Sequence, residues 1–196
     1  NAIRLRNFLK SSLKKKAWNS SAGEKSRQTL PFSDRKLYER GQYTIPSDTV
    51  CYPAKLVHGH IEALIREGAN VIFYPDMTYN IDEKLGDDHF NCPVVAYYPQ
   101  VVKLNISDVN KATFICDFIS LANKGEFSSR IPAILNKHFP YTKIPFKAIK
   151  AATEDAYAEY ADYLENIRKK GDELIEKAKQ TGKPVIVLAG RPDHVD

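Results

Sequence analysis

The sequence predicts an α/β fold, a Rossmann-like three-layer arrangement with a short, mostly parallel sheet and a long C-terminal helix. Short runs of β-branched and aromatic residues, bounded by glycine or proline, stand at 71–74, 94–98 and 185–189. Segments with apolar residues at helical spacing alternate with these runs. Such alternation is typical of parallel strands joined by covering helices. A chain of 196 residues is long enough to bury one hydrophobic core.

The first predicted elements surround a conspicuous cysteine. Residues 33–40 predict a short helix that ends at Gly41, and residues 42–50 predict an extended approach interrupted by Pro46. A helix then follows Cys51, because Pro53 suits a first helical turn, and it ends at Gly68. Its predicted polar face carries Lys55, His58, Glu62 and Arg66. The run 71–74 follows as a buried strand.

The second half of the chain continues this alternation. Residues 76–91 are rich in acids without the spacing of a calcium loop, which indicates a solvated lid. Cys92 and Pro93 open the strand 94–98, and a helix is predicted from 108 to 124, with Gly125 after its end. A short helix is expected over 131–139. The longest helix is expected over 146–180, interrupted or kinked at Gly171, before the strand 185–189.

The net positive charge of the chain comes from its first 30 residues. Residues 1–30 hold eight Lys or Arg and one acid, Glu24, while the whole chain carries +5, so the remainder is slightly acidic. We therefore interpret 1–32 as a basic leader or linker, either a solvated end with a cloning remnant or a contact for an acidic partner. The α/β domain, 33–196, lacks the basic surface of a nucleic-acid binder. No membrane span or signal peptide is recognisable, which favours a cytoplasmic protein.

Three cysteines cannot form a complete disulfide framework, so we consider them as thiols. Cys116 stands in a predicted helix and is interpreted as a small buried hydrophobic residue. Cys51 and Cys92 are candidate ligands for a soft metal, and a helix amino terminus favours the thiolate at Cys51. The turn at Arg191 reaches the same sheet edge as Cys51, whereas Cys92, placed before a strand, reaches it only if the preceding loop folds back.

Two enzyme classes lack their signatures. The pair Gly182-Lys183 lies between a helix and a strand, so it is not a phosphate-binding loop, and no ATP site is expected in this chain. A Cys-His hydrolase with His58 or His60 beside Cys51 lacks a recognisable oxyanion element. No complete active site is apparent.

Three segments, 45–60, 91–95 and 189–192, resemble the activase-related proteins of the 2-hydroxyacyl-CoA dehydratase system. More closely, they are similar to the CoA enzyme activase uncharacterised domain known as DUF2229. The resemblance covers 33–196 and departs from the family pattern at Asp193, where a tyrosine is expected. It implies that the chain is a piece of a longer protein, because this domain usually accompanies ATPase modules and a dehydratase-like domain.

The resemblance also implies a role. It suggests an iron–sulfur-cluster-binding or cluster-supporting domain in ATP-driven, low-potential electron transfer, with Cys51 and Cys92 as ligands and further ligands from outside this chain. Lys55, His58, His60 and Arg191 would line the site. The alternative is a non-catalytic interaction domain that docks ATPase modules to a partner, with metal-free cysteines.

Overall fold

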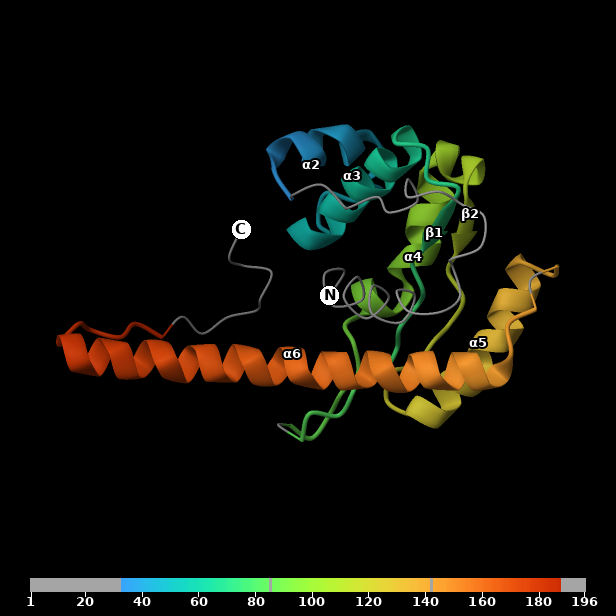
Figure 1. The fold of residues 1–196 in the computed structure, drawn as a ribbon. Helices are drawn as coiled ribbons and strands as arrows, with labels where there is room; N and C mark the ends of the chain where they lie inside the picture. Colours follow the sequence, from blue (N-terminus) through green and yellow to red (C-terminus); the bar gives the residue numbers. More distant parts are fainter. Residues whose placement is uncertain (1–32, 85, 142, 188–196) are drawn as a thin grey trace.

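A computed structural model describes residues 33–84, 86–141 and 143–187. These residues are mostly helical and form a parallel sheet of two strands (Figure 1). The elements are α2 (Arg35–Gly41), the 3-10 helix η1 (Gln42–Thr44), α3 (Tyr52–Arg66), β1 (Val71–Phe73), α4 (Pro93–Asn105), the 3-10 helix η2 (Ser107–Lys111), β2 (Thr113–Ile115), α5 (Lys124–His138) and α6 (Phe146–Thr181). The short parallel sheet and the long C-terminal helix are confirmed. The Rossmann-like three-layer arrangement is not confirmed.

Helices α2 and α3 cross at unusually short range. The Asp34 side chain caps α2 by accepting a hydrogen bond from the Leu37 amide at 2.7 Å. A Cβ atom built on Gly59 of α3 would lie 2.0 Å from the carbonyl oxygen of Leu37, and one on Gly41 would lie 2.3 Å from the Gly59 amide nitrogen. The two glycines therefore allow the two backbones to touch.

The sheet joins two segments that lie about 40 residues apart in the chain. Val71, Ile72 and Phe73 pair in parallel with Thr113, Phe114 and Ile115. Beyond the strands, the amide of Tyr74 still donates to the carbonyl of Ile115 at 2.9 Å. After Pro75 the pairing resumes as an isolated parallel bridge between Asp76 and Phe118. The carboxyl ends of both strands therefore share one edge.

Residues 94–98 form part of helix α4, so the predicted strand there is wrong. Pro93 occupies the first turn of the helix, where a missing N–H costs little. Ala96, Pro99 and Val102 are buried at a spacing of three, which is a helical spacing. Pro99, expected to end a strand, lies inside α4 and removes one helical hydrogen bond. Burial of the surrounding apolar face offsets that loss.

The predicted helix 108–124 is also wrong. The short 3-10 helix η2 is followed directly by β2, whose β-branched and aromatic residues suit a strand. The next helix, α5, begins at Lys124, where the Asn123 side chain accepts a hydrogen bond from the Glu126 amide. Gly125, expected to stop a helix, therefore lies in the first turn of one. The helix predicted at 131–139 is the second half of α5.

Helix α6 matches its predicted bounds within one residue at its carboxyl end. It runs continuously through Gly171, so the expected interruption is absent from this helix, and Gly182 ends it in a left-handed conformation. The predicted strand after it is wrong over its described residues. Val185, Ile186 and Val187 are not in a strand, and 89% of Ile186 is exposed. Residues 188 and 189 of that prediction lie outside the described residues.

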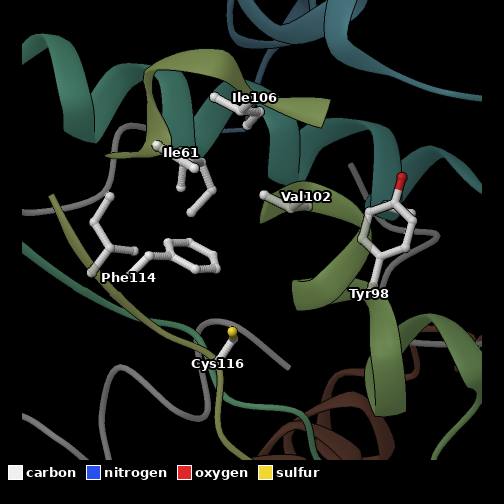
Figure 2. Packing of buried hydrophobic residues seen from close by; sticks show 9 residues of the cluster. Ile61, Tyr98, Val102, Ile106, Phe114 and Cys116 are labelled. Carbon is white, nitrogen blue, oxygen red and sulfur yellow. The ribbon is translucent and has the colours of Figure 1, made fainter. Parts of the chain in front are cut away.

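The main core lies between α3, α4 and β2. Figure 2 shows Ile61 of α3, Val102 of α4 and Phe114 of β2 in one cluster, with Cys116 beside them. Burying each large aliphatic or aromatic side chain contributes roughly 1.5–3 kcal/mol. Cys116 follows β2 instead of lying in a helix, but the prediction that it is buried is confirmed. A second cluster joins α5 to the beginning of α6. No helix among the described residues is long and apolar enough to cross a membrane.

Candidate functional site

Cys51 and Cys92 occupy equivalent positions. Cys51 is the N-cap residue of α3, and Cys92 is the N-cap residue of α4. Each helix has one proline within its first two residues, Pro53 in α3 and Pro93 in α4. The backbone angles agree closely, with φ −62° and ψ 151° at Cys51 and φ −60° and ψ 153° at Cys92. Each carbonyl accepts two amides of the first helical turn at 2.9 to 3.2 Å. Both side chains therefore stand at the amino terminus of a helix.

The two helix starts lie at the carboxyl edge of the sheet. Helices α3 and α4 each run opposite to the strand that follows them, β1 and β2 respectively (Figure 1). Their amino ends therefore face the side of the sheet on which the strands end. Cys92 begins a helix and not a strand. The loop before it folds back, as the sequence required, because Tyr79 and Phe90 form an antiparallel bridge and the Asn91 amide donates to the carbonyl of Thr78 at 2.9 Å.

Two tyrosines lie near the cysteines. Burial raises the pKa of Tyr98, and negative charge at Cys51 raises it further. Burial also raises the pKa of Tyr74, with further contributions from Tyr98, Asp76 and Cys92. Tyr74 directly follows β1, and Tyr98 belongs to α4. Cys51 thus lies near the buried Tyr98, and Cys92 lies near the half-buried Tyr74. Cys51 is half-buried, and Cys92 is exposed.

A buried carboxylate stands at the same edge. Asp76 is fully buried, and its Oδ2 accepts a hydrogen bond of 2.6 Å from Nε2 of Gln100. Its Oδ1 has no hydrogen-bond partner among the described residues. Burial raises the pKa of this carboxyl group, against the lowering effect of Gln100. Gln100 also donates to the carbonyl of Cys116 at 3.1 Å, which ties α4 to the residue after β2.

His58 lies inside the core and not on the predicted polar face of α3. Its side chain is fully buried, and burial lowers its pKa from 6.5 to about 4. The Thr44 hydroxyl donates to the carbonyl of Gly41, so it accepts from Nδ1 of His58 at 2.8 Å. Nε2 of His58 then accepts the hydroxyl proton of Tyr98 at 3.0 Å. This neutral imidazole joins α3, α4 and η1.

The other predicted lining residues are placed differently. The Lys55 ammonium donates to the carbonyl of Asp48 at 2.8 Å, one turn after Cys51. His60 pairs through Nε2 with the Ser33 hydroxyl at 3.2 Å, and burial lowers its pKa. Its Nδ1 has no partner among the described residues. Arg191 lies outside the described residues. The structure thus places Cys51 and Cys92 at one edge, with Lys55 near the first.

The sheet edge offers one pair of soft donors, the thiols of Cys51 and Cys92. In the part of the chain that the structure describes, no three His, Cys, Asp or Glu residues are grouped so that they could hold a metal ion. Sequence reasoning missed Asp76, because it placed this residue in a solvated, acid-rich loop. The available signal was its position three residues after the strand β1, where parallel sheets collect ligands.

Comparison with family models identifies a domain family. Residues 28–196 match the family model described as CoA enzyme activase uncharacterised domain (DUF2229). The match covers most of the chain, including α2 to α6 and both cysteines at the sheet edge. No curated protein and no solved structure matches the chain.

Proposed function

We propose, for a chain that belongs to the CoA enzyme activase domain family DUF2229, that its carboxyl sheet edge binds or supports an iron–sulfur cluster. The matching helix-capping positions of Cys51 and Cys92 are the observation that carries this proposal. A cluster held there supplies one-electron transfer at low potential. The partners we propose are ATPase modules and a dehydratase-like domain, on the same or another chain.

The donor chemistry fits half of a cluster site. Iron–sulfur clusters take thiolate ligands, commonly four. This edge presents two thiols, of which Cys51 is half-buried and Cys92 is exposed. The remaining ligands must come from outside the described residues, because these contain no larger donor group. Cys51 and Cys92 would bind iron through their Sγ atoms, and the amides at the starts of α3 and α4 would stabilise the thiolates.

The neighbouring side chains have supporting tasks in this proposal. Tyr98 and His58 form a neutral hydrogen-bonded pair, which joins the middle of α3 to α4 without adding charge. Lys55 adds a positive charge one turn from Cys51, and its bond to Asp48 fixes the preceding loop. The Asp76–Gln100 pair fixes α4 to the strand ends in the same way. A preorganised ligand pair loses less entropy on binding.

Anaerobic reconstitution with iron and sulfide tests the proposal, using the natural chain that contains residues 1–196 together with its ATPase partner. We expect bound iron and sulfide, with a broad visible absorption, in the wild type. Cys51→Ser and Cys92→Ser should each lose most of the bound iron. Cys116→Ala is the matched control, because this thiol is buried in the core, and it should retain the cluster.

Two results would overturn the ligand assignment. One is full iron and sulfide content in both serine variants. The other is a wild-type protein that stays colourless with all partners present, although circular dichroism shows that it is folded. The second result would leave the domain as a non-catalytic docking module with metal-free cysteines.

A further inference from the structure

From Tyr157 onward, helix α6 carries an apolar stripe with the spacing of a coiled coil. Apolar or small residues recur at alternating intervals of three and four, which is the heptad pattern, over about three heptads. We call these positions the α6 stripe: Tyr157, Tyr160, Leu164, Ile167, Gly171, Leu174 and Ala178. A straight helix that only covers a globular core has no need of this strict repeat.

The body of the protein covers the first half of α6, where the Tyr160 hydroxyl donates to Oε1 of Glu83 at 3.3 Å. The buried residues of this helix are Ile149, Thr153 and Ala156, all in its first third. The Tyr157 hydroxyl still donates to the carbonyl of Leu121, at 2.8 Å. Farther along, Ile167 is 51% exposed and Leu174 is 58% exposed. Figure 1 shows the distal half of α6 extending away from the helices and strands of the body.

The positions that flank the α6 stripe are basic or uncharged. In a heptad abcdefg, positions a and d form the core of a coiled coil, and positions e and g face the flanks of the partner helix. Position e follows each d residue, and position g precedes each a residue. Here these flanking residues are Ala161, Tyr163, Arg168, Lys170, Ile175 and Lys177. None is acidic. Acidic residues of the same helix stand farther from the stripe, and Glu173, for example, holds Lys170 at 2.8 Å.

This charge pattern selects among occupants. A second copy of α6 would bring no acidic flank to Arg168, Lys170 or Lys177, so self-pairing gains no ion pair across the interface. The basic segment 1–30 is mismatched for the same reason. A helix with an apolar heptad stripe and Glu or Asp at its flanks matches both the spacing and the charge.

We propose that the α6 stripe docks an amphipathic helix with acidic flanks, supplied by a partner protein. Leu164, Ile167 and Leu174 pack into the apolar seam of that helix, and Gly171 leaves room for one of its large side chains. Arg168, Lys170 and Lys177 pair with its carboxylates. The inference is independent of the thiols at the sheet edge, because these residues belong to the distal part of α6.

A pair of designed helices tests the proposal directly. Both have three heptads with leucine at the core positions, but one has Glu at the flanking positions and the other has Lys. We expect the Glu-flanked helix to bind the chain at least about tenfold more tightly by fluorescence anisotropy, with a preference that shrinks as salt rises. The double variant I167S/L174S should lose this binding, and circular dichroism checks that its helix content is kept.

A charge swap with a matched control sharpens the test. The double variant K170E/K177E should reverse the preference toward the Lys-flanked helix, because it inverts two flanking charges. K169E/K179E introduces the same charge change away from the flanks and should leave the preference within about twofold. Equal binding of both helices, or no binding of either, would overturn the proposal. So would a wild-type chain that dimerises through α6 in sedimentation and resists competition by the Glu-flanked helix.

Discussion

Helices α3 and α6 have equally clear helical patterns in the sequence but opposite surroundings in the fold. Helix α3 buries residues along most of its length and packs against α2, α4 and η2. Helix α6 is more than twice as long, at 36 residues against 15, yet it buries three residues near its start. The difference shows that helical periodicity predicts a helix, while its burial depends on distant partners.

Their glycines express the same contrast. Gly59 of α3 has no space for a Cβ atom, since the Leu37 carbonyl oxygen would be 2.0 Å away. Gly171 of α6 has nothing within 4 Å of the position that a Cβ would take. Gly59 is required by a helix crossing, whereas no described neighbour of Gly171 requires a glycine there. The same substitution should therefore have opposite effects at the two sites.

The largest predicted effect is that of Gly59→Ala. Its methyl group would overlap the backbone of α2, so α2 must move away and the contacts of the buried Leu37 are lost. We expect the free energy of unfolding to fall by more than about 3 kcal/mol, measured by urea titration. A loss below about 1 kcal/mol would show that α2 and α3 adjust freely and that the close crossing is not required.

The next effect is a fall in the free energy of unfolding at acid pH, caused by His58 of α3. Burial lowers the pKa of His58 from 6.5 to about 4, so the unfolded chain binds this proton more readily between those pH values. The stabilisation by neutral His58 is complete above about pH 6.5 and is lost as pH falls toward 4, roughly 3 kcal/mol in total. His60 acts in the same direction, because burial lowers its pKa too.

Urea unfolding at several pH values measures this effect. The slope of stability against pH between 4 and 6.5 should be clearly smaller in His58→Gln, which removes the titrating group. Helix α6 contains no histidine, so the substitution should not change its own acid response. Equal slopes in wild type and variant would contradict the assignment of a neutral, buried His58.

The sequence predicts those elements whose boundaries are marked by local chemistry. Pro53 and Gly68 delimit α3, and Gly182 ends α6, because proline suits a first turn and glycine a left-handed cap. The strand–helix exchange at α4 and β2 was not predictable locally. Val94 to Tyr98 have strand propensity, but the apolar face that includes Val102 is buried only when the segment is helical.

The candidate site was predicted in its residues but not in its layout. Cys51 and Cys92 were identified from their type and from the family resemblance, and their role as ligands stays a prediction. Cys92 returns to the residues after β1 because the preceding loop folds back through the Tyr79–Phe90 bridge, and it then begins helix α4. Asp76 and His58 were misjudged as exposed, because their burial depends on Gln100 and Tyr98, which come from the misassigned segment.

The smallest predicted effect is that of Gly171→Ala, and it completes the comparison. Alanine is favoured over glycine in a helix interior by about 1 kcal/mol, and no neighbouring atom opposes its methyl group. Because the body does not cover this part of α6, the gain should stabilise the helix locally. Amide hydrogen exchange around residue 171 should slow by roughly threefold to fivefold, with little change in the urea midpoint. Faster exchange would mean that the added methyl group collides with a segment that covers residue 171. Helix α6 would then be packed at this position, as α3 is at Gly59.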